Sequence, residues 1–187
     1  KYLHYAKKAG TRVVLVNPYR EPGMERYWVP SIPESAVFGT KIADKTFLIT
    51  QGGDIAFLSG ALKHIFEKDL VDHAFIAEHT TGFDALKSSI EAMNWKELET
   101  ASGLSEKEMR AFGQMVGTAK TAVFVWSMGI TQHTTGEENV RAIVDLALTR
   151  GFVGRDMCGL MPIRGHSGIQ GGAEMGAYST AFPGGVS

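Results

Sequence analysis

Three short apolar runs, separated by helix-like segments, constrain the fold of this chain more than any other feature. Residues 11–16 (TRVVLV), 45–50 (KTFLIT) and 121–126 (TAVFVW) are rich in β-branched and aromatic side chains, which favour buried strands. Strands that alternate with helices predict an α/β fold, here a Rossmann-like, doubly wound and mostly parallel sheet with helices on both faces. We therefore expect the three strands to bury apolar side chains on both of their faces.

The segments between these runs carry helix signals. Residues 2–9 precede the first strand as a short helix, and residues 51–54 (QGGD) turn the second strand into a helix with an apolar face. Residues 70–104 are typical of several short helices. Ser105 and Glu108 have the spacing of a capping box, which predicts that another helix begins there.

A last helix is predicted over residues 137–150, and the residues from 152 onward show no helix or strand periodicity. Residues 17–40 hold four of the six prolines and exceed the roughly 12 to 15 residues of an ordinary loop, so this segment is either ordered by packing or functional. We assign residues 1–151 to an α/β domain and the glycine-rich residues 152–187 to a flank that leaves it. The alternative for residues 160–187 is a disordered tail.

Composition excludes several classes of function. The 19 Lys and Arg residues nearly balance the 20 Asp and Glu residues, and the formal charge of -1 indicates neither nucleic acid nor an acidic membrane surface as a partner. Cys158 is the single cysteine, so this chain cannot hold an iron-sulfur cluster or a thiolate zinc site. No apolar run approaches the roughly 20 residues that span a bilayer, which predicts no membrane insertion. Because the chain begins in mid-pattern without Met, we expect it to be a central piece of a longer, cytoplasmic protein.

The carboxyl ends of the predicted strands are the first places to look for a ligand, because glycine turns and helix N-termini meet there. Asn17 follows the first strand, where the ribose or base of a nucleotide would be recognised, although an ordinary strand exit is the alternative. Gly53 and Asp54 follow the second strand. The Asp54 carboxylate could accept hydrogen bonds from the N1 and amino groups of a guanine, or it could simply cap the next helix.

The loop after the third strand, SMGITQHTTG, combines glycine with soft and polar side chains. Gly129 and Gly136 free the backbone for the close approach of a ligand. The side chains that would line such a cradle are Met128, Thr131, Gln132 and His133. The alternative is that this loop only caps the next helix through two overlapping capping boxes. Those boxes would join Thr134 and Thr135 to Glu137 and Glu138.

The densest group of glycine and polar residues is GLMPIRGHSGIQGGAEMGAY, at residues 159–178. Arg164 can hold a carboxylate with two parallel N–H bonds, and His166 can donate a hydrogen bond or move a proton near neutral pH. Gly165 between them removes side-chain bulk beside a fixed charge. A flexible tail with a solvated arginine is the alternative.

Two long motifs in this order, VWSMGITQHTTGEENVRAIVDLALTRGFVG and GLMPIRGHSGIQGGAEMGA, resemble the catalytic alpha subunit of molybdenum-dependent formate dehydrogenases. The likeness extends over nearly all of the chain, including GGDIAFLSGALKHIFEKDLVDHAFIAEHTTGF, and is strongest to the formate-dehydrogenase-like oxidoreductase branch. It implies two molybdopterin guanine dinucleotides that hold molybdenum or tungsten, and an iron-sulfur cluster outside this chain. The family's cysteine or selenocysteine metal ligand has no match here, so we expect no metal ligand in these residues.

The resemblance also implies roles for individual residues. The implied cofactor contacts are Asn17, Gly53, Asp54, Met128, Gly129, Gln132 and Gly165. Arg164 matches the arginine that orients the carboxylate of formate, whereas His166 stands where the family carries glutamine. The flank 152–187 would return toward the molybdenum site, and the segment 19–40 is longer than the family's usual connection.

These roles imply an enzyme that this chain forms only in part. The intact protein would take two electrons from formate or a related small substrate and pass them to a redox partner protein or acceptor. The other domains of the same polypeptide would complete the cofactor site, so the chain alone is expected to be inactive. The alternative, from a different class, is a free-standing nucleotide-binding or assembly module without redox activity.

Overall fold

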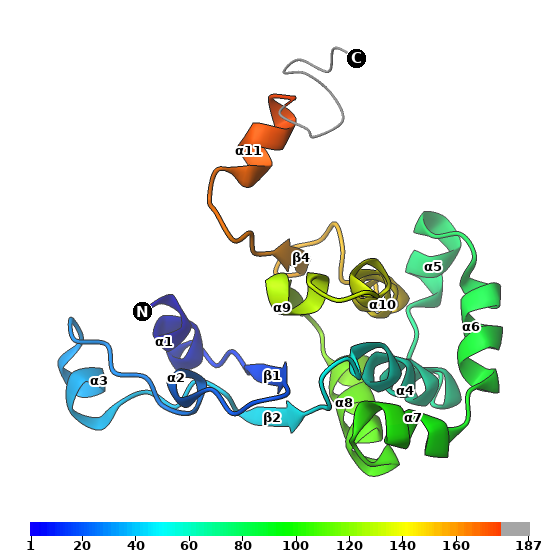
Figure 1. The fold of residues 1–187 in the computed structure, drawn as a ribbon, viewed down its shortest axis with the longest axis horizontal. Coiled ribbons are helices and arrows are strands. Elements are labelled where there is room, and N and C mark those ends of the chain that lie inside the picture. Colours follow the sequence, from blue (N-terminus) through cyan, green and yellow to red (C-terminus); the bar gives the residue numbers. More distant parts are fainter. Residues whose placement is uncertain (177–187) are drawn as a thin grey trace.

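A computed structural model of the chain describes residues 1–176, and these form an α/β structure with short parallel strands (Figure 1). Strand β1 (Val14–Asn17) pairs with β2 (Lys45–Leu48), and β3 (Val123–Trp126) pairs with β4 (Gly159–Pro162). Both pairs are parallel, as predicted, but among the described residues they form two separate two-stranded sheets. A single doubly wound sheet is thus not formed within this part of the chain.

Helices make up most of the remaining structure. They are α1 (Tyr2–Lys8), α2 (Pro22–Glu25), α3 (Pro33–Phe38), α4 (Asp54–Glu67), α5 (His73–His79), α6 (Phe83–Ala92), α7 (Trp95–Ser102), α8 (Glu106–Thr118), α9 (Met128–Thr131), α10 (Gly136–Thr149) and α11 (Ile169–Glu174). The predicted helix after the QGGD turn and the predicted short helices between the second and third strands are confirmed. The capping box of Ser105 and Glu108 is present in full at the start of α8. No helix among residues 1–176 has both the length and the apolar character needed to cross a membrane.

The core is organised around α4, which contacts α6, α7, α8 and α10. Three buried aromatic rings join β2 to these helices: the Phe57 ring lies 5.4 Å from Phe47 and 4.8 Å from Phe112. Glycine allows α4 and α8 to approach closely, because a Cβ on Gly113 would lie 2.6 Å from the Ala61 carbonyl oxygen. The carboxyl end of β2 is therefore held against a rigid helical layer.

Strand β3 is covered on one face only, so the prediction that it buries apolar side chains on both faces is wrong. In β2, Phe47 is buried but Leu48 is exposed, and β1 is half-buried along its whole length. In β3 the side chains of Phe124 and Trp126 pack against the core, whereas Val123 is 50% exposed and Val125 is 54% exposed. Helices α6, α7, α8 and α10 pack around α4 rather than on opposite sides of one sheet, while α5 and α9 contact α10. A four-residue strand cannot by itself indicate which of its faces will find a partner.

Two segments with weak sequence patterns are ordered. The proline-rich segment forms α2 and α3 and an antiparallel bridge between Tyr27 and Thr40, so packing orders it. The glycine-rich flank begins with β4, a strand that the sequence pattern did not indicate because it holds both Gly159 and Pro162. Beyond β4, α11 stands away from the rest of the molecule in Figure 1. Residues 177–187 of the predicted flank lie outside the described residues, and the domain boundary at residue 151 stays a prediction.

Candidate functional site

Asp54 lies at the carboxyl end of the first sheet, in the first turn of α4, where it is nine-tenths buried. Burial raises the pKa of the Asp54 carboxyl, and a hydrogen bond from its own backbone and the charge of His133 lower it in part. No Lys or Arg of residues 1–176 forms an ion pair with it. Gly53, not Asp54, is the N-cap of α4, so the alternative that Asp54 caps this helix is wrong. The site therefore has a largely buried carboxylate that, within the described residues, has no Lys or Arg partner.

The QGGD turn that presents Asp54 is held by the end of α7. The Thr50 N–H donates to the Ser102 carbonyl oxygen at 2.8 Å, and the Gly53 N–H donates to the Thr50 carbonyl oxygen at 2.8 Å. A Cβ on Gly53 would lie 2.7 Å from the Ala101 carbonyl oxygen. Gly53 is thus required for packing of the turn, while its contact with a cofactor stays a prediction.

Asn17 shares this edge of the molecule, because β1 and β2 are parallel and Asn17 lies opposite Leu48. Its side-chain Nδ2 donates to the Tyr19 carbonyl oxygen at 2.7 Å and so shapes the strand exit. The Asn17 side chain is half-buried. This geometry agrees with an ordinary strand exit and leaves the predicted nucleotide contact of Asn17 open.

The loop after β3 forms a second edge, built from α9 and the exit of β4. The Ser127 hydroxyl donates to the Ile163 carbonyl oxygen at 2.7 Å, which ties the two strand ends together. The same contact brings Met128 against Gly165, where an added Cβ would lie 2.5 Å from the Met128 Sδ. An added Cβ on Gly129 would meet no atom of residues 1–176 within 4 Å, so these residues leave its backbone uncovered. Met128, Gly129 and Gly165, three of the predicted cofactor contacts, therefore lie close together. Gln132, the remaining predicted contact in the loop after β3, is exposed.

The start of α10 differs from the sequence prediction. Thr135 is its N-cap but its side chain accepts no capping hydrogen bond, so the overlapping capping boxes are wrong. Glu137 instead pairs with Arg141 one turn along the helix. The loop is held by other contacts: the His133 Nε2–H donates to the Gly129 carbonyl oxygen at 2.8 Å, and buried Asn139 donates to the carbonyl oxygen of Ile130 in α9. Sequence reasoning missed Asn139, because a polar residue after two glutamates carries no signal of burial.

Arg164 and His166 are exposed and lie on the segment between β4 and α11. The Arg164 guanidinium donates through Nε and Nη2 to the Gln170 Oε1 at 3.3 and 3.1 Å. Gln170 in turn donates to Glu174 at 3.4 Å. The structure does not bring this pair to Asp54, so the catalytic roles of Arg164 and His166 stay predictions.

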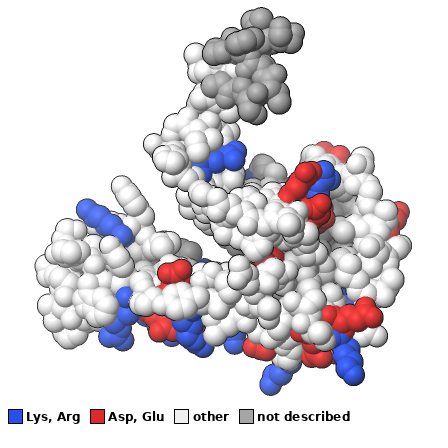
Figure 2. Space-filling view, in the orientation of Figure 1, with Lys and Arg blue, Asp and Glu red and all other residues white. Residues whose placement is uncertain are grey.

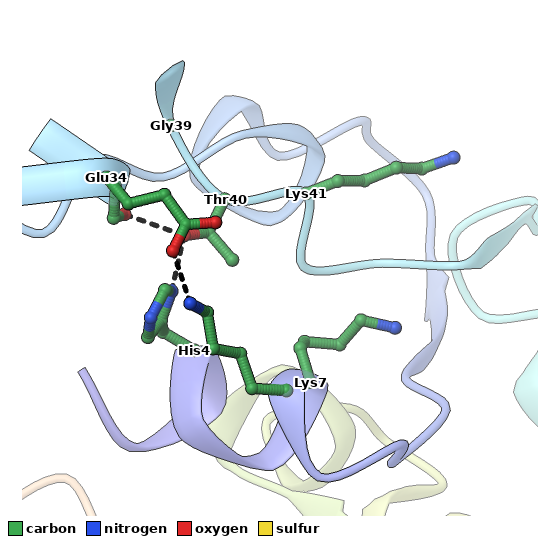
Figure 3. A pocket seen from close by; sticks show the side chains of 8 residues that line it. His4, Lys7, Glu34, Gly39, Thr40 and Lys41 are labelled. Carbon is green, nitrogen blue, oxygen red and sulfur yellow. Dashed lines mark hydrogen bonds and ion pairs between the residues drawn. The ribbon is translucent and has the colours of Figure 1, made fainter. Parts of the chain in front are cut away.

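A separate hollow of about 260 Å³ lies between α1 and the segment that contains α3 (Figure 3). Its floor is a chain of hydrogen bonds in which His4 Nδ1 lies 2.7 Å from Thr40 Oγ1, which lies 2.6 Å from Ser35 Oγ. Lys8 forms an ion pair with Glu34 across the hollow. No residue predicted for the cofactor site lines it, and most of its polar side chains bind one another or, in the case of Lys7, the nearby Asp44. The contacts around the hollow therefore hold α1 against the proline-rich segment, and we do not assign a ligand to it.

This junction carries a prediction. Replacing Thr40 with valine keeps the shape of the side chain but removes the hydroxyl that joins His4 to Ser35, so the free energy of unfolding should fall by about 1–2 kcal/mol. Hydrogen exchange should accelerate over residues 27–40 in particular. The matched control is Thr118→Val, which removes an exposed hydroxyl that bonds only within α8. Equal effects of the two substitutions on stability would contradict the proposed junction.

Charged side chains are mixed in sign over the face of the molecule seen in Figure 2. Lys and Arg lie beside Asp and Glu both on the lobe that holds α1 to α3 and on the helical half. Ion pairs such as Lys7 with Asp44, and Arg110 with Glu67 and Glu106, account for part of this mixing. This face therefore has no large patch of a single charge sign that would mark a binding site, so the candidate site is recognised from its local geometry.

Comparison with known proteins gives this geometry a context. No family model matches the chain. It is 34% identical over 181 residues to Protein YdeP of Escherichia coli (strain K12), covering 90% of this chain and 24% of that protein. It is 31% identical over 179 residues to formate dehydrogenase H of the same organism, covering 96% of this chain and 23% of that protein. The alpha subunit of F420-dependent formate dehydrogenase 1 from Methanococcus maripaludis is also 31% identical, over 96% of this chain and 24% of the subunit.

A solved structure shows the same fold. Acetylene hydratase from Pelobacter acetylenicus superposes with a TM-score of 0.68 at 20% sequence identity, over 82% of this chain and 19% of that one. The chain thus spans about a quarter of the length of the curated relatives that it matches. The predicted resemblance to the alpha subunits of formate dehydrogenases is confirmed.

Proposed function

We propose that this chain, a relative of the formate dehydrogenase alpha subunits, forms part of the cofactor-binding region of a molybdenum or tungsten oxidoreductase. In the intact protein it would hold the guanine end of a bis-molybdopterin guanine dinucleotide cofactor. The observation that carries this proposal is the Asp54 carboxylate, which is buried at a strand end and forms no ion pair with Lys or Arg among residues 1–176. The substrate would be formate or a related small molecule, and a redox partner protein or acceptor would receive the electrons.

Guanine offers the hydrogen-bond donors that the Asp54 carboxylate could accept. A carboxylate accepts two hydrogen bonds side by side, and the N1–H and exocyclic amino group of guanine offer two parallel donors. Burial raises the pKa of Asp54, which means that its charged form is poorly solvated there. Two hydrogen bonds donated by guanine would stabilise that charged form, and they are stronger in a buried site than in water. The first N–H groups of α4, a helix of 14 residues, face the same strand end and favour negative charge there. The residues present therefore fit the nucleotide portion of the cofactor.

The second strand end would hold the remaining portion of the nucleotide. Gly129 presents backbone to open space, and Met128 lies against Gly165, so the loops after β3 and β4 form a single surface of soft and backbone groups. Exposed Gln132 adds an amide that can donate or accept. This arrangement supports the proposed contacts of all four residues with the cofactor.

Substrate binding is proposed for the segment after β4. When bound, the metal centre supplies the two-electron chemistry, and the protein supplies placement and charge. Arg164 would hold the carboxylate of the substrate through a forked pair of N–H bonds. His166 would donate a hydrogen bond to the substrate or move a proton. The fork of Arg164 is exposed and donates to one neutral acceptor, Gln170 Oε1, which a substrate carboxylate would have to replace.

The proposal is tested by Asp54→Asn in the full-length protein. The amide keeps the shape but loses the charge and one acceptor, so cofactor retention should fall by about 10-fold or more. Guanine nucleotide released per chain after denaturation is the measurement. The matched control is Asp84→Asn, which changes an exposed acidic residue in the first turn of α6. Unchanged guanine content in the Asp54 variant would exclude this residue as the guanine acceptor.

In the cofactor-free protein, Asp54→Asn should raise the stability of the fold at neutral pH, although it weakens cofactor retention. The folded-state pKa of Asp54 is raised, so the folded protein holds the proton more tightly than the unfolded chain does. Stability contributed by this residue is then lost as the pH rises from its unfolded pKa of about 4 through the raised value. Cofactor-free Asp54→Asn protein should therefore have a higher Tm than the parent at pH 7 and an equal Tm near pH 3. A lower Tm at pH 7 would show that Asp54 stabilises the fold.

A further inference from the structure

Asn139 is fully buried in the first turns of α10, where its side chain serves the neighbouring loop. The Nδ2 group donates to the Ile130 carbonyl oxygen in α9 at 3.0 Å. Within residues 1–176 the Oδ1 atom is buried and finds no hydrogen-bond donor. A buried acceptor without a donor costs free energy that an apolar side chain would avoid. Stability of the fold alone therefore does not account for asparagine at this position.

The element that Asn139 holds cannot maintain its position by itself. Helix α9 is a single turn of four residues, and an isolated turn of helix is unstable in water. Ser127 fixes one end of α9 to the exit of β4 through the Ile163 carbonyl oxygen. Asn139 fixes the other end to α10. The two anchors together set the position of the backbone between residues 128 and 132.

A third contact limits how far this turn can move. Gly136 lies directly against the backbone of Thr131, so closely that an added Cβ would overlap the Thr131 carbonyl oxygen. The contact prevents α9 from sinking toward α10, while the Asn139 hydrogen bond prevents it from lifting away. The pair holds α9 at one depth, which a cofactor contact requires.

We infer that Asn139 is a positioning residue, which holds Met128 and Gly129 at the depth where they meet the cofactor. This inference rests on the proposed function, because it assigns a purpose to the placement of α9. The amide of Asn139 acts through Ile130 and does not itself reach the surface of the site. Its loss should loosen the loop and weaken cofactor binding without unfolding the protein.

The deciding variant is Asn139→Leu in the full-length protein. Leucine has a similar volume, removes the unpaired acceptor and removes the hydrogen bond to Ile130. We expect the Tm to stay nearly level, because removal of the unpaired Oδ1 offsets loss of the hydrogen bond to Ile130, while amide exchange over residues 128–132 of the cofactor-free protein accelerates by about 5-fold or more. Guanine nucleotide retained per chain should fall by about 5-fold. A residue with a merely structural role would lower the Tm and cofactor retention together, and that result would overturn the inference.

Two further variants make the test specific. Asn139→Ala removes the same hydrogen bond to Ile130 without adding bulk or charge, so it should loosen α9 in the same way and decides the matter if the leucine variant does not fold. Thr149→Val is the control, because it changes a buried hydroxyl at the other end of α10 that bonds only to the Asp145 carbonyl oxygen. Parent-like exchange over residues 128–132 in both Asn139 variants would overturn the inference.

The same measurements separate this inference from the proposed function. Faster exchange with reduced cofactor retention supports both. Faster exchange with unchanged retention would confirm the anchoring of α9 but overturn its role in cofactor placement. If Asp54→Asn also retained the cofactor, the proposed function itself would fail; if only the Asn139 variants did, the inference alone would fail.

Discussion

Replacing Arg164 with alanine in the full-length protein should lower kcat/KM for the proposed oxidation of formate by at least about 100-fold. The guanidinium is an exposed fork whose Nε and Nη2 groups share the single acceptor Gln170, and a carboxylate would offer it two oxygens instead of one. Alanine removes both the charge and the fork. Steady-state kinetics over a range of formate concentrations is the measurement, and most of the loss should appear in KM if Arg164 serves binding alone.

Controls for this prediction come from the same chain. Arg20→Ala removes an exposed arginine that pairs only with Glu25, and it should leave formate turnover unchanged. Arg164→Lys keeps the charge but not the planar fork, so its activity should lie between that of the parent and the alanine variant. Formate turnover near the parent's level in Arg164→Ala would remove this arginine from the substrate site.

Replacing Phe57 with alanine should lower the free energy of unfolding of the chain by about 3–5 kcal/mol. The ring is fully buried and packs on both Phe47 and Phe112, so its removal leaves a cavity between β2, α4 and α8 that rigid helices cannot fill. A loss of this size is a large part of the roughly 5–15 kcal/mol that stabilises a domain. Urea unfolding of the 187-residue chain, followed by circular dichroism, is the measurement.

The matched control is Phe38→Ala, because Phe38 is 71% exposed on α3. Its removal should change the free energy of unfolding by less than about 0.5 kcal/mol. If both substitutions had the same small effect, the aromatic group around Phe57 would not be the core of the folded chain. If the parent chain showed no cooperative transition, the two sheets would need further parts of the protein to fold.

Local signals made much of this structure predictable. The capping box at Ser105, the QGGD turn before α4 and the short apolar runs each act within a few residues, so they indicate helices and strands directly. The long motifs that contain Met128 and Arg164 were sufficient to predict the relationship to formate dehydrogenases. Local signals failed at β4, where glycine and proline conceal a strand that forms only because β3 lies beside it.

The sequence by itself determined the first three strands and the longer helices, the candidate residues at the strand ends and the family resemblance. Only the tertiary structure decided that the strands form two separate pairs, that β3 leaves Val123 and Val125 exposed, and that Asn139 anchors α9. It also decided that Asp54 is buried and, among residues 1–176, forms no ion pair with Lys or Arg. The physical reason is range: helix caps and hydrophobic spacing act over a few residues, whereas burial and strand pairing depend on which distant segments come into contact.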